Sequence, residues 1–196
     1  GAAQDLYAEG YESWGTAVPT TWRFDTAGVG TLSAVTSGSP HGGARHLLFN
    51  PDAYGANQAA WVAVDLTGYE TATDLALDFW VKREDNGNTA YFYVDLSGNG
   101  TVWQEVLGYV GASTTYTNYF LDLDALAMAK GIAVDGDVYV RFRHYNSYYS
   151  SSHLYLDDVR VLAGDLAGPK VTGHAPTAVS SSGGPLNQIV VTFDEA

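Results

Sequence analysis

Strict two-residue alternation of apolar and polar side chains is the feature that most constrains how this chain folds. It runs through residues 75–81, where every second side chain is large and apolar, and it recurs at 91–96 and 138–145. Successive side chains of a β-strand point to opposite faces of its sheet, so this period predicts strands with one buried face. Helical periodicity is absent from these segments, and the chain is therefore predicted to be all-β.

Further apolar runs and the turns between them extend this pattern. Residues 85–88, 97–100 and 135–137 are rich in Gly, Asn and Asp, which favour hairpin turns. One short helix is expected at 125–130, with Asp124 as its N-cap and Gly131 at its end. Many short strands joined by tight turns predict a jelly-roll β-sandwich of two antiparallel sheets. The other candidate strands are 45–49, 60–66, 102–107, 118–123, 153–162 and 188–193.

Composition supports this prediction and narrows the possible partners. The 196 residues include 22 glycines and 14 tyrosines, which suit turns and pleated strands, and no cysteine, which excludes disulfides. The net charge is −13, from 22 acidic and 9 basic residues, and argues against nucleic acid because phosphates attract basic surfaces. No apolar run is long enough to span a bilayer, so membrane insertion is not expected.

A change in composition near residue 164 predicts the domain organisation. Residues 1–163 are assigned to the sandwich and 164–168, which contain Gly and Asp, to a linker. The segment 169–196 holds a Ser/Gly-rich stretch and few strands, and two strands are too few for an independent domain. We therefore expect 169–196 to be either the start of a second domain or strands that lean on the first.

Six segments follow one another in a characteristic order. They are GYESWGTAVPTTW (10–22), SPHGGARHLLF (39–49), VDLTGYETATDLALDFWVK (64–82), DLSGNGTVWQEVL (95–107), VYVRFRHYNS (138–147) and LYLDDVRVL (154–162). This ordered series resembles MAM-like, carbohydrate-binding-type jelly-roll modules of bacterial exported proteins over about residues 6–163. The segment 168–196 is similar to the first strands of a bacterial Ig-like domain. The resemblance implies an accessory module that is secreted or on the cell surface, beside other domains of one parent chain, with a glycan or protein ligand.

The resemblance also implies a structural calcium between an early carboxylate and an aspartate of the last strand. The matching residues are Glu12 and the pair Asp157 and Asp158, with Glu9 in reserve. Calcium binds six to eight oxygens, and the Gly-rich segment 41–44 offers backbone carbonyls. The alternative is that these carboxylates bond to backbone amides or to an arginine. The loop 95–100 begins like an EF-hand loop, but its flanking strands favour a hairpin turn.

Aromatic and cationic side chains occupy the polar positions of the alternating strands. If these strands share a sheet, their rings and guanidinium groups form a surface on which a sugar can stack and hydrogen-bond. The loop 146–152 adds tyrosines at the rim of this surface. Lys82 has the same phase. The alternative is that loops or a neighbouring domain cover this face. The predicted ligand-binding residues are Trp80, Tyr91, Tyr93, Tyr139, Arg141, Arg143, Tyr145, Tyr148 and Tyr149.

Catalysis finds little support in the sequence. The five histidines lack metalloprotease spacing, and no nucleophile elbow is present. A glycosidase needs two facing carboxylates; Asp78 and Asp95 could meet on the polar face, but nothing singles them out. We therefore expect a non-enzymatic module that binds a polysaccharide or other glycan. The alternatives are a protein-interaction or spacer module, or an adhesin segment.

Overall fold

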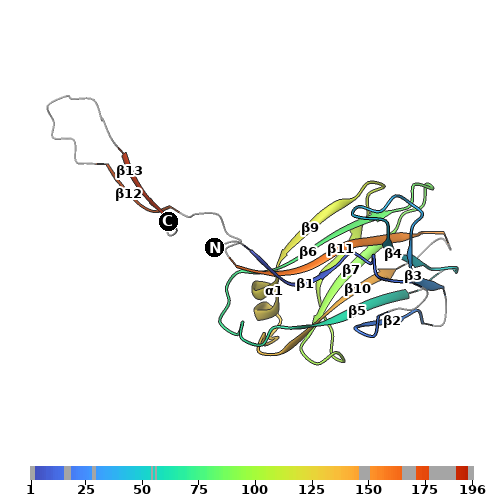
Figure 1. Cartoon of the computed structure of the whole chain (residues 1–196), viewed down its shortest axis with the longest axis horizontal. Helices are drawn as coiled ribbons and strands as arrows, with labels where there is room; N and C mark the ends of the chain where they lie inside the picture. The colour runs from blue at the N-terminus through green and yellow to red at the C-terminus, as the bar shows by residue number, and fades with distance from the viewer. Residues whose placement is uncertain are drawn as a thin grey trace.

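The computed structural model of the chain describes residues 3–15, 19–27, 30–53, 55, 57–145, 151–164, 171–176 and 189–193. Two antiparallel sheets face each other and form a jelly-roll β-sandwich, with one short helix at one end (Figure 1). The prediction of an all-β sandwich is confirmed. Strands that are neighbours in a sheet are mostly distant in sequence, as a jelly roll requires.

The first sheet, named here the β11 sheet, is centred on the last strand of the sandwich. Its order is β3-β4-β11-β6-β9, and β1 also pairs with β11. The first half of β11 pairs with β4 and the second half with β1, and the register against β6 shifts between Asp157 and Arg160. The strands are β1 (Gln4–Glu9), β3 (Thr31–Val35), β4 (His46–Asn50), β6 (Leu75–Arg83), β9 (Thr117–Asp122) and β11 (Leu154–Ala163).

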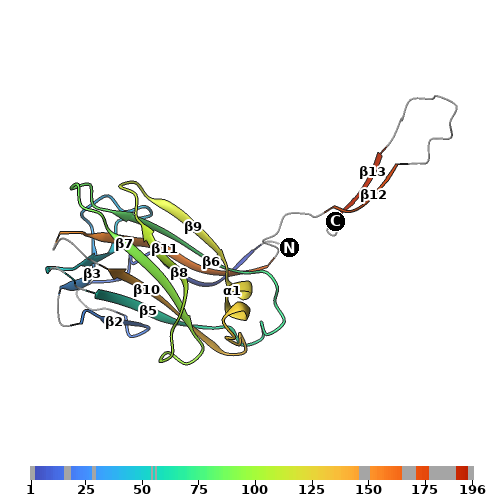
Figure 2. The same cartoon turned by 180° about the vertical axis from the view of Figure 1, so that it is seen from behind.

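The second sheet, named here the β10 sheet, has the order β2-β5-β10-β7-β8 (Figure 2). Its central strand pairs with β5 on one side and β7 on the other over most of its length. Two of these strands, β7 and β10, contain the segments 91–96 and 138–145 that alternate clearly in the sequence, whereas the third such segment, 75–81, lies in β6 of the other sheet. The strands are β2 (Trp22–Asp25), β5 (Asn57–Asp65), β7 (Tyr91–Ser97), β8 (Gln104–Gly111) and β10 (Asp137–Tyr145).

The core lies between the two sheets, and alternation predicts its strand residues correctly. Phe142 of β10, Phe92 of β7 and Phe79 of β6 are buried, and the ring of Phe79 contacts the other two rings edge-on. Tyr11 and Trp14 are buried too, although they lie outside strands. The aromatic residues of the opening segment 10–22, which resembles a family signature, are thus core residues: Tyr11, Trp14 and Trp22.

The short helix α1 (Leu123–Ala129) begins two residues earlier than predicted. Its N-cap is Asp122, whose carboxylate accepts a hydrogen bond from the amide of Ala125, and not Asp124 as expected. Asp124 lies in the first turn and accepts a bond from the amide of Leu75. The prediction of Asp124 as the cap was wrong because the helix already begins at Leu123, so the residue before it, Asp122, takes the capping position.

Strands β12 (Val171–Pro176) and β13 (Ile189–Phe193) pair antiparallel in a two-stranded sheet of their own. The segment 165–170 lies outside the described residues, so the linker and the Ig-like assignment of 169–196 stay predictions. Within the described ranges, no helix is long and apolar enough to cross a membrane.

Candidate binding surface

The outer face of the β10 sheet carries a row of charged and aromatic residues. Register places Arg23 of β2 opposite Trp61 of β5, and Trp61 opposite Arg141 of β10. Arg141 lies in turn opposite Asp95 of β7, and Asp95 opposite Glu105 of β8. The row therefore crosses all five strands of the sheet at one level.

Asp95 is the buried centre of this row. Its Oδ2 accepts a hydrogen bond from Nε of Arg141 at 2.8 Å and one from Nε of Arg143 at 2.5 Å. Its Oδ1 accepts a third from Nη2 of Arg143 at 2.9 Å. These bonds to Asp95 are the main reason why the pKa of Arg143 is raised. The aspartate is 2% exposed and the arginines 21% and 31%, so the carboxylate holds both guanidinium groups at the surface.

A tryptophan pair flanks Arg141. The guanidinium carbon of Arg141 lies 4.1 Å from the ring centre of Trp103, which precedes β8. Trp103 meets Trp61 edge-on, with ring centres 6.0 Å apart and planes at 72°. Each ring is partly exposed. The two rings and the guanidinium group thus form an amphipathic corner that combines apolar faces with planar donors.

A second aromatic group lies along the same face. The guanidinium carbon of Arg143 is 4.5 Å from the ring centre of Tyr93, and Tyr91 stacks on Tyr109 with ring centres 4.3 Å apart. Tyr145 is the register partner of Tyr91. The structure therefore brings six of the predicted residues to one face. They are Tyr91, Tyr93, Tyr139, Arg141, Arg143 and Tyr145.

One of these six residues, Tyr139, lies at the end of this face beside a cavity. A cavity of about 290 Å³ is formed by Thr20, Thr21, Arg23, Trp61, Ala63 and Tyr139. The ring of Tyr139 packs against the backbone of Gly100, where a Cβ atom would approach the ring to 3.0 Å. The close contact with a glycine fixes the ring at the edge of the hollow.

Trp80 and Lys82 do not belong to this surface, contrary to the prediction. Both lie on β6 in the β11 sheet. Trp80 stacks on His41 at 3.8 Å, and the ammonium of Lys82 is buried and donates to the carbonyls of Gly38 and Ser39. Alternation fixes which face of its strand a residue occupies, but it does not reveal which of two sheets the strand joins.

The same separation applies to the two aspartates weighed for catalysis. Asp78 lies on β6, where it accepts hydrogen bonds from Arg160 and Asn118. Asp95 lies on the other sheet and is bonded to its own arginines. The predicted Tyr148 and Tyr149 fall outside the described residues.

Sequence reasoning missed Trp61 and Trp103. Trp61 had a usable signal, because it alternates with Ala60 and Val62 in a predicted strand and these two are buried. Trp103 lay in the predicted strand 102–107, but the observed strand β8 begins only at Gln104, so Trp103 belongs to the turn between β7 and β8.

The predicted calcium ligands meet at one loop, residues 41–45. The amides of His41 and Gly42 donate to Oδ2 of Asp157 at 2.8 and 3.3 Å. The amides of Ala44 and Arg45 donate to Oε1 of Glu12. Burial, together with the charge of the neighbouring Asp158, raises the pKa of Asp157 to about 6.

Asp158 also contacts this loop, and it lies where the register between β11 and β6 shifts. Its φ is 45°, and its Oδ2 lies 2.6 Å from Nδ1 of His41. A Cβ atom on Gly42 would lie 2.6 Å from that carboxylate, and one on Gly43 would collide with Glu12. Glycines therefore let the backbone approach both carboxylates. Among the described side chains, no three His, Asp or Glu residues are arranged to hold a metal, so calcium would also need backbone carbonyls.

Comparison with known proteins places the fold. No family model matches the chain, and no curated protein sequence does either. The module TmCBM61, solved in complex with β-1,4-galactotriose, has a TM-score of 0.56 at 17% identity and covers 79% of this chain and 94% of its own. The family 11 carbohydrate-binding module from Clostridium thermocellum, solved with a β-1,3-1,4-mixed-linked tetrasaccharide, has 0.55 at 11% identity, covering 83% and 96%.

The K3 cleaved adhesin domain of Lys-gingipain from Porphyromonas gingivalis is similar to the same extent. Its TM-score is 0.59 at 17% identity, and the alignment covers 83% of this chain and 100% of that one. These likenesses define the class of fold, a jelly-roll sandwich of the kind found in carbohydrate-binding modules and adhesin domains.

Proposed function

We propose that this chain is a non-catalytic carbohydrate-binding module, an accessory part of a secreted or cell-surface multidomain protein. Its binding site is the outer face of the β10 sheet around Trp61, Trp103 and Arg141. The single observation that carries the proposal is the corner where two tryptophan rings and a guanidinium group meet above buried Asp95.

The chemistry of this corner suits a sugar. A pyranose presents C–H groups on its faces and hydroxyl groups around its edge, so it needs a ring to stack on and planar polar groups beside that ring. Trp61 and Trp103 supply the rings, and Arg141 supplies the donors. Asp95 holds Arg141 in place before any ligand arrives, which lowers the entropy lost on binding.

Affinity electrophoresis in gels that contain β-1,4-galactan, xylan or β-1,3-1,4-glucan tests the proposal. We expect at least one polysaccharide to retard the protein, and Trp61→Ala or Arg141→Ala to weaken binding by about tenfold, equivalent to about 1.4 kcal/mol. Phe120→Ala is the matched control, because Phe120 is 52% exposed but lies on the β11 sheet. Equal loss in the control, or no retardation by any soluble or insoluble polysaccharide, would favour a protein-interaction or spacer module instead.

Calcium bound at the 41–45 loop is a second part of the proposal. Asp158 and one of its neighbours, Glu12 or Asp157, would hold the ion together with backbone carbonyls, and the ion would offset the negative charge that gathers at this loop. This would fasten the loop to β11 and to the segment that follows β1.

Thermal unfolding with calcium and with EDTA tests the metal. If calcium binds the folded state alone at a hundred times its Kd, it adds about 2.7 kcal/mol and raises Tm by about 5–10 °C. Asp158→Asn should abolish this rise, whereas Asp85→Asn, in the turn between β6 and β7, should retain it. Identical melting curves with calcium and EDTA would remove the metal from the proposal.

A further inference from the structure

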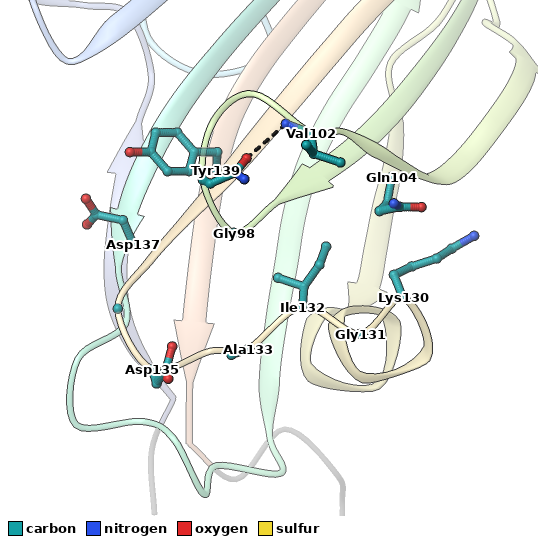
Figure 3. Close-up of a pocket in the computed structure, with 12 residues that line it drawn as sticks. Gly98, Val102, Gln104, Lys130, Gly131, Ile132, Ala133, Asp135, Asp137 and Tyr139 are labelled. Carbon is teal, nitrogen blue, oxygen red and sulfur yellow. Dashed lines mark hydrogen bonds between the residues drawn. The ribbon is translucent and has the colours of Figure 1, made fainter.

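A larger cavity lies on the far side of Tyr139 from the hollow beside Trp61. It has a volume of about 600 Å³ and lies between the turn that connects β7 with β8 and the loop that follows α1 (Figure 3). That volume is in the range of small-molecule binding sites in proteins. Ile132 points from the loop toward Gly98, where a Cβ atom would lie 3.6 Å from its methyl group.

Both walls of this cavity are held by hydrogen bonds. In the turn, Oγ of Ser97 accepts bonds from the amides of Asn99 and Gly100, and Oδ1 of Asn99 accepts from the amides of Thr101 and Val102. The opposite loop is fixed by bonds from the amide of Ile132 to Ala127 and from the amide of Leu66 to Gly136. The cavity is therefore formed before any ligand binds, which favours affinity.

The lining combines exposed apolar groups with unused polar groups. Val102 is 60% exposed, and Ile132 and Ala133 lie across from it. Four polar side chains have no hydrogen-bond partner in the part of the chain that the structure describes; these are Gln104, Lys130, Asp135 and Asp137. This differs from the sheet face, where Asp95 and its arginines satisfy one another.

The charges of the lining indicate what kind of ligand fits. The lining contains two carboxylates, Asp135 and Asp137, and only one ammonium, Lys130, so an anionic ligand is disfavoured. Carboxylate oxygens accept bonds from hydroxyl groups, and Gln104 both donates and accepts. An uncharged molecule with hydroxyl groups at its edge and C–H groups on its faces matches this lining.

Tyr139 lines both cavities, so the two hollows flank one ring. We propose that the larger cavity is a second carbohydrate subsite, which takes the continuation of an uncharged polysaccharide chain that crosses the sheet face and passes over Tyr139. The inference rests on the proposed function. It adds that recognition extends beyond the sheet to the Gly98–Val102 turn and the loop after α1, and that the ligand is the interior of a neutral chain.

Calorimetric titration with size ladders tests this subsite. The probes are oligosaccharides of β-1,4-galactan, xylan and β-1,3-1,4-glucan, from disaccharide to hexasaccharide, with an oligogalacturonide ladder as the anionic comparison. We expect affinity for one neutral ladder to rise with length until both hollows are filled. Gln104→Ala and Asp135→Ala should each weaken the hexasaccharide about three- to tenfold and leave the disaccharide unchanged.

Two controls separate the possible results. Asp85→Ala removes an exposed carboxylate far from the cavity in sequence and should change nothing, whereas Trp61→Ala should weaken ligands of every length. Amide signals of Gly98 and Ala133 should shift with the hexasaccharide and not with the disaccharide. Binding by the unmodified protein with no effect of the cavity variants would overturn the subsite and leave the proposed function standing. Preference for the anionic ladder would also overturn it, and failure of every ladder would overturn both.

Discussion

At the scale of single residues, the surface depends on one buried carboxylate. Asp95 accepts three hydrogen bonds from two arginines, while Glu105, its register partner on β8, accepts one from Arg143 at 3.1 Å. The two acids differ in burial, since Asp95 is 2% exposed and Glu105 is 51% exposed. A buried acceptor shared by two cations contributes far more than an exposed one, because water screens the latter.

Replacing each acid by its amide tests this difference. Asp95→Asn should lower the free energy of unfolding by about 1–3 kcal/mol, because two partly buried guanidinium groups lose their charged partner. Glu105→Gln should change it by less than about 0.5 kcal/mol. Urea unfolding of both variants measures the two effects. Equal losses would mean that Asp95 does not organise the arginines.

The sequence predicted which of these residues face outward, but it did not predict their contacts. Arg141 and Arg143 follow the alternation of β10, and Asp95 follows that of β7. Their meeting depends on the register between β10 and β7, which brings together residues 46 and 48 positions apart. The ring of Trp103 lies over Arg141 from the turn before β8, whereas the sequence analysis had placed this residue in a strand over 102–107.

At the scale of elements, the start of α1 shows how a local motif is read incorrectly. Aspartate is a favourable N-cap, and the sequence analysis assigned this role to Asp124, whereas Asp122 caps the helix in the structure. The structure chooses Asp122 because β9 ends there, at the residue that pairs with Ala76 of β6. Asp124 is then free to accept a bond from Leu75, so it joins the helix to β6. The pairing of β9 with β6, rather than the local sequence, therefore sets the residue at which this helix begins.

The cap assignment can be checked directly. Asp122→Ala should lower the free energy of unfolding by about 1 kcal/mol, because the amide of Ala125 loses its acceptor at the helix N-terminus. Asp135→Ala serves as the control, since that side chain is exposed and has no hydrogen bond within the described ranges, and it should change stability by less than about 0.5 kcal/mol. A loss no greater than that of the control would return the cap to Asp124.

At the scale of the whole molecule, the order of strands in the sheets explains the main error of prediction. Strand β6 shows the same clear alternation as β7 and β10, yet it lies in the opposite sheet. Its polar positions are covered: Lys82 by the loop after β3, and Asp78 by Arg160. A two-residue period predicts that a segment is a strand and which of its side chains share a face. It does not predict which sheet the strand joins, because that depends on pairing between strands distant in sequence.

The same covered region gives the molecule a pH-sensitive contact at His46. This histidine is fully buried in β4, and its two ring nitrogens bond to residues of two different loops. The carbonyl of Ser37 only accepts, so Nε2 of His46 donates to it at 2.6 Å, and Nδ1 accepts from the hydroxyl of Tyr116 at 2.5 Å. Burial, with the nearby charge of Lys82, lowers the pKa of His46 to about 4. Protonation would cost the bond from Tyr116.

The direction of the effect on stability follows from these pKa values. An unfolded histidine titrates near 6.5, so between about pH 6.5 and 4 the unfolded chain binds a proton that folded His46 does not. His46 therefore makes the protein less stable as pH falls through this range, by at most about 1.4 kcal/mol per pH unit. Asp157, with its raised pKa, acts in the opposite direction over the same range, so the total change conceals the contribution of His46.

Comparing the unmodified protein with His46→Gln isolates that contribution, because Asp157 and the other titrating groups are present in both. Glutamine does not titrate, so we expect the difference in unfolding free energy between the two proteins to shrink as pH falls from 7.5 to 4.5. Urea unfolding at intervals across this range measures the difference. A difference independent of pH would mean that His46 titrates normally, and hence that the Ser37 and Tyr116 contacts do not bury it in solution. A shrinking difference would show that His46 is buried in solution, as its bonds to Ser37 and Tyr116 on the covered face of the β11 sheet require.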